Sequence, residues 1–173
     1  DANGEVIEGE IPESSVTTVS IAGTTSFNCP AGSTPIWKTL TVSGTIELSN
    51  HCDWRGAGSI FNCVIANSTL NLKGYNLRVA VPNGYASRKI TVTDDSQAGE
   101  GGEFHLEVNE NDTFKNGCLW NNDNQFWFDG SVHVVKDGKG TYQIGAGHDA
   151  TGLRFYKHSG GTTIHEGLLF LNN

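Results

Sequence analysis

The sequence predicts an all-β fold of short strands stacked as a solenoid, and three observations lead to this prediction. The 173-residue chain contains 22 glycines against 4 prolines, which is typical of many short strands joined by turns. Apolar residues recur at every second position, as in half-buried strands. No window shows the 3.6-residue periodicity of an amphipathic helix of useful length.

The predicted strands follow one another from Val16 onward. The first of them are VTTVSIAG, TLTVSGTIELS, STLNLKGYNLRVAV and KITVTDD. The later ones are FHLEV (104–108), FWF (126–128), VHVV (132–135), TYQI (141–144), LRFY (153–156) and LLFL (168–171). Residues 1–15 are acidic and hold few apolar anchors, so we expect an N-terminal arm there and a single β-solenoid domain over residues 16–173.

The spacing of the strands favours a solenoid over a β-sandwich. Units of roughly 20–30 residues are separated by irregular polar loops, a rhythm typical of stacked coils with variable corners. These units begin near Val16, Leu40, Leu70, Phe104 and Val132. Asn-Gly and Asp-Gly pairs, such as those at 83–84 and 137–138, are typical of hairpins, so a sandwich is the alternative.

The charge and composition of the chain exclude some classes of partner. Acidic residues outnumber basic ones by 19 to 11, and Asp1, Glu5, Glu8, Glu10 and Glu13 all precede the first basic residue. An acidic chain without a Lys/Arg cluster argues against nucleic acid or an anionic membrane as partner. No apolar run reaches the roughly 18 residues of a membrane span. The chain has no methionine, which favours a processed N-terminus after removal of a signal peptide.

The four cysteines are Cys29, Cys52, Cys63 and Cys118, without a CxxC pair or zinc-like spacing. Two disulfides in an exported protein are the favoured interpretation, and buried free thiols are the alternative. We expect Cys29 to pair with Cys52, about one coil away, and Cys63 with Cys118. The competing pattern joins Cys52 to Cys63 and leaves Cys29 for Cys118.

Four segments together resemble a known repeat: STLNLKGYNLRVAV, GGEFHLEV, WFDGSVHVVKDGKGTYQIG and SGGTTIHEGLLFLNN. Over about residues 65–173 the chain resembles the autotransporter-associated β-strand repeat. Its K-x-G-x-G-T turn is matched by Lys136, Gly138, Gly140 and Thr141. Its closing element is matched by Gly160, Gly161, Thr162, Thr163, Ile164, Gly167 and Leu169. The resemblance implies a right-handed parallel β-helix in an exported or cell-surface protein, with an irregular N-terminal part where residues 1–64 depart from the pattern.

The KDGKG turn has a structural interpretation. Its glycines are expected to supply positive φ or close backbone approach at a corner between coils. We expect the stem of Lys136 to lie along the apolar edge with its ammonium in water. Ile164, Leu169 and Leu171 are expected to fill the interior stack. No helix follows the turn, which argues against a phosphate-binding loop.

We expect no catalytic residue, no cofactor and no metal site beyond weak Ca²⁺ binding at NNDN (121–124). The carboxylates of Asp94, Asp95, Glu107, Glu110 and Asp112 are interpreted as solvated corner residues, with Asp94 and Asp95 on opposite faces of a strand. The six histidines lack metal-ligand spacing. His105 and His133 alternate with apolar residues, so both should face outward.

Several side chains are candidates for binding or assembly. Trp54, Trp120, Trp127 and Tyr156 are candidates for a binding or assembly surface, although Trp127 also suits the core. Asn67 and Asn111 lie in sequons for glycosylation. Val6, Ile7 and Ile11 in the N-terminal arm are expected to pair with the C-terminal coil of the next subunit, which would build a filament.

The favoured function is therefore an exported, non-enzymatic structural or adhesion protein of the cell surface. Its expected partners are copies of itself and an extracellular polysaccharide. The alternative is a carbohydrate-binding module, and a polysaccharide lyase or hydrolase is less favoured because no acid/base constellation is evident.

Overall fold

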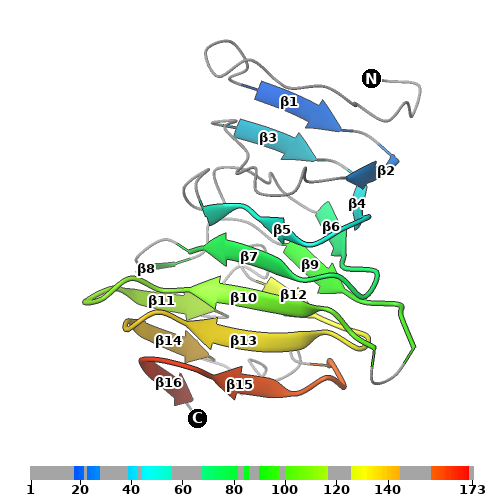
Figure 1. The fold of residues 1–173 in the computed structure, drawn as a ribbon. Coiled ribbons are helices and arrows are strands. Elements are labelled where there is room, and N and C mark those ends of the chain that lie inside the picture. Colours follow the sequence, from blue (N-terminus) through cyan, green and yellow to red (C-terminus); the bar gives the residue numbers. More distant parts are fainter. Residues whose placement is uncertain are drawn as a thin grey trace.

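The computed structural model describes residues 18–21, 23–27, 39–42, 44–55, 68–81, 84–85, 90–97, 100–116, 126–144 and 157–171. In this part of the chain nearly all regular structure is parallel β-sheet. Three long sheets run along the molecule, and successive strands of each sheet come from successive turns of the chain (Figure 1). No helix among these residues is long and apolar enough to cross a membrane.

The strands divide among three long sheets and one short sheet. Sheet 1 contains β2 (Thr24–Phe27), β4 (Thr45–Leu48), β6 (Ser68–Asn71), β9 (Ile90–Thr93) and β12 (Phe126–Phe128). Sheet 2 contains β5 (Cys52–Asp53), β7 (Leu77–Ala80), β10 (Glu103–Glu107), β13 (His133–Asp137) and β15 (Thr162–Ile164). Sheet 3 contains β8 (Gly84–Tyr85), β11 (Thr113–Asn116), β14 (Thr141–Ile144) and β16 (Leu168–Leu171). The short sheet pairs β1 (Thr18–Ile21) with β3 (Thr39–Val42).

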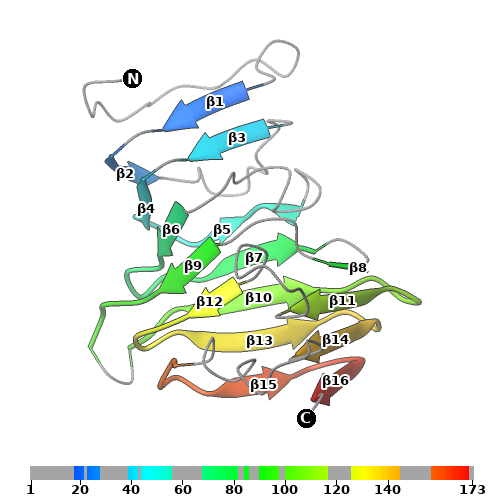
Figure 2. The same ribbon diagram turned by 180° about the vertical axis from the view of Figure 1, so that it is seen from behind.

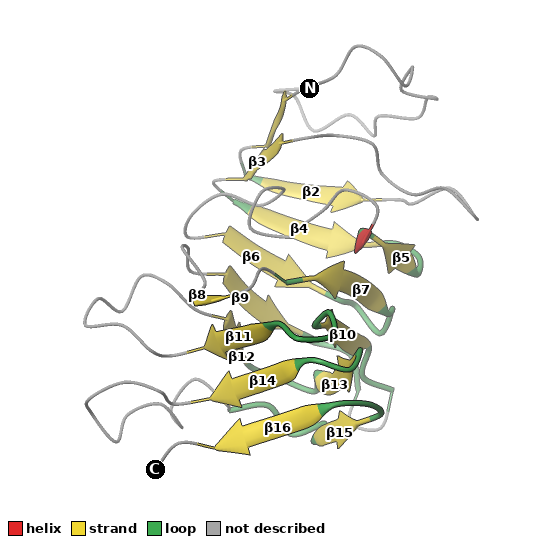
Figure 3. Cartoon of the chain, turned by 90° about the vertical axis from the view of Figure 1, so that its left-hand side faces the viewer, coloured by secondary structure: helices red, strands yellow, loops and turns green. Residues whose placement is uncertain are grey.

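One coil passes from sheet 1 to sheet 2 to sheet 3 and returns to sheet 1, as in the path β9, β10, β11 and β12. Seen from the N-terminal end, this path turns clockwise as it moves away, so the solenoid is right-handed (Figures 1 and 2). The stacked edges are clearest from the side (Figure 3). The prediction of a right-handed parallel β-helix is confirmed, and the parallel pairing excludes the hairpin-built sandwich for these strands.

The register of the parallel strands places residues of similar type above one another in successive coils. On the outside of sheet 1, Thr24, Thr45, Thr69 and Thr91 form one column, which continues to Trp127. The neighbouring inward column holds the apolar residues Ile46, Leu70, Val92 and Phe128. Because side chains alternate between the two faces of a strand, a two-residue pattern in the sequence becomes one apolar column inside the solenoid.

The core fills the space between the three sheets. Its aromatic part joins all three, because the ring centroid of Phe126 in sheet 1 lies 5.3 Å from that of Phe104 in sheet 2 and 5.9 Å from that of Phe114 in sheet 3. Within sheet 3, Phe114 stacks on Tyr142 at 5.6 Å. Asn116 is a polar residue buried beside this apolar core. Its side-chain NH2 group donates to the carbonyl of Phe126, and its side-chain oxygen accepts from the N–H of Phe126. These bonds satisfy the backbone at a corner that sheet hydrogen bonds do not reach.

The KDGKG corner behaves partly as predicted. Gly138 has a φ of 74°, and a Cβ on Gly140 would collide with the carbonyl oxygen of Asn109. Positive φ and close approach are both tolerated because glycine has no Cβ.

The prediction for Lys136 is wrong. It is fully buried, 0% exposed, because its register with Leu106 places it on the inward column of sheet 2. Its Nζ donates to the carbonyls of Asp137 at 2.7 Å, Gly138 at 2.5 Å and Glu166 at 3.0 Å. Burial lowers the pKa of this ammonium, and the three carbonyls replace the water that it loses.

Asp94 and Asp95 lie on opposite faces, as predicted, but only Asp95 is solvated. Asp94 is 2% exposed and accepts hydrogen bonds from the backbone N–H groups of Gly74, Ser96 and Gly102 at 3.0, 2.8 and 2.6 Å. The interpretation of Asp94 as a solvated corner residue is therefore wrong. Its carboxylate joins two coils by satisfying N–H groups that the sheets leave unpaired.

Candidate functional site

Beyond β15 and β16, no described strand covers the apolar interior of the solenoid. β15 pairs with β13 and β16 with β14, and no described strand pairs with their other edges. The large apolar side chains that are exposed among the described residues all lie in these two strands. They are Ile164 at 46%, Leu168 at 66%, Phe170 at 52% and Leu171 at 62%.

Two of these side chains belong to inward columns. Ile164 follows Lys136, and Leu171 follows Ile144, which β16 covers so that it is only 5% exposed. Leu169 packs partly against the core, as predicted. Ile164 and Leu171 take inward positions in the stack, as predicted, but no described coil covers them, so both are exposed.

Histidines attach the last coil to the one before it. The imidazole of His158 bonds the carbonyl of Val132 at 2.9 Å, and His133 bonds the hydroxyl of Thr163 at 2.8 Å. Burial lowers the pKa of His158, although the bond to Val132 opposes this shift. Burial therefore favours the neutral imidazole at this position.

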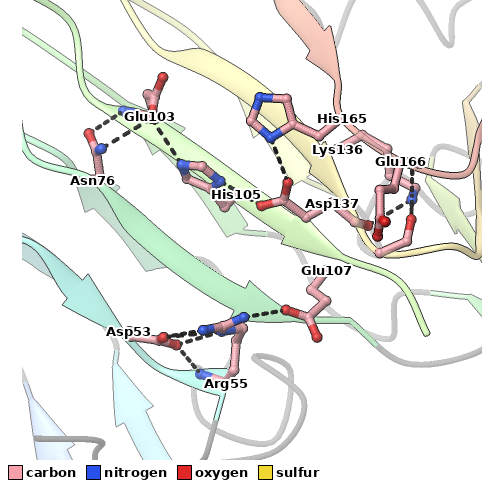
Figure 4. A network of polar contacts seen from close by, with 11 residues as sticks. Asp53, Arg55, Asn76, Glu103, His105, Glu107, Lys136, Asp137, His165 and Glu166 are labelled. Carbon is pink, nitrogen blue, oxygen red and sulfur yellow. Dashed lines mark hydrogen bonds and ion pairs between the residues drawn. The ribbon is translucent and has the colours of Figure 1, made fainter. Parts of the chain in front are cut away.

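A charged network covers the outer face of sheet 2 (Figure 4). Both ring nitrogens of His105 face carboxylates, Asp137 at 2.6 Å and Glu103 at 3.0 Å. Asp137 also accepts from His165 Nδ1 at 2.9 Å. Burial alone would raise the pKa of Asp137, but the bonds and charges of the two histidines outweigh it and lower that pKa. Alternating acids and imidazoles thus link β10, β13 and the turn after β15.

A second part of the network contains Arg55. Its guanidinium pairs with Asp53 at 2.6 Å and reaches across to Glu107, also at 2.6 Å. Both carboxylates raise the pKa of Arg55 through hydrogen bonds, chiefly the one to Asp53. All three side chains are about one-third exposed, so the pairs contribute little stability and mainly orient the guanidinium.

A hollow of about 380 Å³ lies on this face between the two parts of the network. It extends across several coils, because its walls come from the ends of β5 and β15 and from β7, β10 and β13. The lining residues are Arg55, Arg78, Glu107, Asp137, Gly138, His165 and Glu166. All of them are charged or polar except glycine, so the hollow suits a ligand that is polar on most of its surface.

The predicted surface aromatics are not brought together. Trp54 is 1% exposed, because it alternates with the outward Asp53 and enters the core. Its assignment to a binding surface is therefore wrong. Trp127 lies outward on β12 and is half-buried, while Trp120 and Tyr156 fall outside the described residues.

Several other predictions also lie outside the described residues. These are Val6, Ile7 and Ile11 of the arm, the sequon residue Asn67, the loop 121–124, and Cys29, Cys63 and Cys118. Cys52 is buried in the core at 4% exposure, and the disulfide pairing stays a prediction. Asn111 is an exposed turn residue with a φ of 70°, and its glycosylation also stays a prediction.

His105 and His133 both face outward, as predicted. His105 is nevertheless only 3% exposed, because carboxylates and the ring of His165 surround it. The two do not stack, since register pairs His133 with Glu103 and His105 with Val135. Within the described ranges, no group of three or more His, Cys, Asp or Glu is placed to hold a metal ion.

Sequence reasoning missed the network itself. Its local signal is the alternation of polar residues in EFHLE (103–107) and HVVKD (133–137), which places Glu103, His105 and Glu107 on one face. The contacts between coils also require the register, which the sequence alone does not provide.

Comparison of the chain with protein-family models, with curated proteins and with solved structures finds no match. The function is therefore argued from two features of this structure, the open last coil and the polar hollow on sheet 2.

Proposed function

We propose that this protein is an exported, non-enzymatic β-solenoid of the cell surface that serves structure or adhesion by assembling end to end into fibres. The observation that carries the proposal is the open last coil. It gathers the exposed large apolar side chains of the described residues on two edge strands. The resemblance of residues 65–173 to an autotransporter-associated repeat supports the surface setting.

The backbone of β16 offers hydrogen bonds to an added strand. Leu168 donates its N–H to Gly140 in the preceding coil. Because N–H groups alternate in direction along a strand, those of Leu169 and Leu171 are directed toward the free edge. An exposed edge of this kind is a template for strand addition.

We assign the added strand to the N-terminal arm, residues 1–15, of a second copy. The arm has three large aliphatic residues, Val6, Ile7 and Ile11, that can cover the inward positions of the last coil. A contact between one end of a subunit and the other end of the next is heterologous, so it repeats without closing and gives a filament.

The expected affinity is modest. Covering the exposed parts of Ile164 and Leu171 contributes about 1 kcal/mol each, and each new backbone hydrogen bond about 1 kcal/mol. Association and ordering of the arm oppose these gains by several kcal/mol. We therefore expect assembly to depend on concentration and to strengthen with salts that favour apolar burial.

Sedimentation velocity over a concentration series tests the proposal. The parent chain is expected to form growing oligomers, and a double variant with Ile164→Asp and Leu171→Asp is expected to stay monomeric. Leu168→Asp is the matched control, because it adds a charge to the same strand at an outward position. Circular dichroism of each variant reports whether the sheets persist. A parent that is monomeric at every concentration, or a double variant that assembles like the parent, contradicts the proposal.

A further inference from the structure

We propose that the hollow on sheet 2 binds a uronate residue of an acidic polysaccharide. The hollow lies on the outer face of sheet 2, whereas the added strand of the proposed assembly would pair with the free edge of β16. The inference therefore does not rest on end-to-end assembly.

The anionic group of the ligand is assigned to Arg78. This guanidinium lines the hollow from β7 and is exposed, and no hydrogen bond or ion pair of its side chain occurs among the described residues. Its neighbour Arg55 is already occupied by Asp53 and Glu107. Arg78 therefore has its planar fork of donors available for a bidentate carboxylate.

Other residues that line the hollow offer groups for hydroxyls. His165 is held through Nδ1 by Asp137, which fixes its ring and leaves Nε2 toward solvent (Figure 4). Glu107 uses Oε2 for Arg55, and its other oxygen has no bond within the described part of the chain. Glu166 adds an exposed carboxylate to the same wall. Such a mixture of donors and acceptors matches the alternating hydroxyls of a sugar ring.

The charges of the wall select among polar ligands. Glu107, Asp137 and Glu166 would repel a doubly charged phosphate more strongly than a group with one negative charge. A neutral sugar could accept hydrogen bonds from Arg78 through its hydroxyls, but it could not form the charge-assisted bidentate pair that a carboxylate forms. A uronate carries one carboxylate beside several hydroxyls, which suits a hollow lined by one available guanidinium together with three acids and an imidazole. The hollow crosses several coils, so a chain of such residues can enter and leave along the solenoid axis.

Titration by isothermal calorimetry tests the site with tetramers of galacturonate, mannuronate and glucuronate. The fully methyl-esterified galacturonate tetramer is the uncharged analogue. We expect saturable binding of at least one acid tetramer. For galacturonate, we expect the ester to bind at least tenfold more weakly. Arg78→Gln should weaken binding of the acid by at least tenfold, and His165→Gln by a smaller factor. Lys139→Gln is the matched control, because Lys139 is an exposed cation of the neighbouring turn that does not line the hollow.

Three results would overturn the inference. The first is the absence of saturable binding for all three acid tetramers. The second is a galacturonate tetramer that binds saturably while its ester binds equally well. The third is an Arg78→Gln protein that binds the acid tetramer like the parent. A sugar site can fail in this test while subunits still assemble, so its failure is distinguishable from failure of the proposed assembly.

Discussion

Replacing Gly138 by alanine removes the glycine that turns the chain between β13 and β14. Its φ of 74° belongs to the left-handed region, and a Cβ there would collide with the carbonyl oxygen of Val108 in the preceding coil. That oxygen accepts the N–H of Gly140 at 3.0 Å. The substitution therefore strains the turn and opens a contact between two coils.

The expected loss in the free energy of unfolding is the sum of two contributions. A left-handed conformation costs an alanine about 1–2 kcal/mol. Displacing the Val108 carbonyl leaves a buried hydrogen bond unmade, which costs about 1–3 kcal/mol. Together these give a loss of about 2–5 kcal/mol, and at about 2–4 °C per kcal/mol for a chain of this size the melting temperature should fall by on the order of 10 °C.

Two other glycines separate the contributions in the same assay, thermal unfolding followed by circular dichroism. Gly161 has a φ of 83°, and a Cβ added there would meet no atom within 4 Å, so Gly161→Ala should cost only about 1–2 kcal/mol. In Gly140→Ala the new Cβ would collide with the carbonyl oxygen of Asn109, but the φ of this residue is not positive. This variant therefore reports the cost of a collision alone. The reasoning is refuted if Gly138→Ala melts within about 2 °C of the parent, or if Gly161→Ala is equally damaging.

Three further predictions concern Lys136, His158 and the cysteines. Lys136→Met leaves three carbonyls without their donor, so urea unfolding should show a loss of about 1–3 kcal/mol in the free energy of unfolding. Lys139→Met, on the exposed side of the turn, should change that free energy by less than about 0.5 kcal/mol. Equal effects of the two substitutions would contradict the buried position of Lys136. Burial lowers the pKa of His158 in the folded protein, so as pH falls below about 6.5 this imidazole is protonated in the unfolded chain before it is protonated in the folded one. The free energy of unfolding should therefore decline as pH falls through this range. His158→Asn should make that decline less steep. Peptide mapping without reduction should find Cys29 joined to Cys52, and a peptide that joins Cys52 to Cys63 would favour the competing pattern.

The sequence predicts well what depends on neighbouring residues along the chain. Two-residue alternation identifies the strands, and the glycines of KDGKG identify a corner, because both effects act within a few residues. The outward positions of His105 and His133 follow from the same alternation.

What the sequence does not reveal depends on register between coils. Lys136 is polar, so its placement in water is the natural expectation, yet its alignment with Leu106 places it inside. The contacts of Asp137 with His105 and His165 likewise join three coils. Coil lengths differ, as the pairing of Thr69 with Thr91 and then of Thr91 with Trp127 shows. The sequence of this chain alone therefore does not show which residues of one coil pair with which residues of the next.

Hydrogen exchange at the amides of β16 tests the central claim, that the open last coil receives the N-terminal arm of a second copy. Quenched exchange would be compared between the parent chain and a chain lacking residues 1–15, at equal concentration. Leu168 is the internal reference, because its N–H already bonds Gly140. We predict that the amides of Leu169 and Leu171 are protected in the parent and exchange rapidly after the deletion, while Leu168 changes little. Equal exchange of Leu169 and Leu171 in the two chains would contradict the claim.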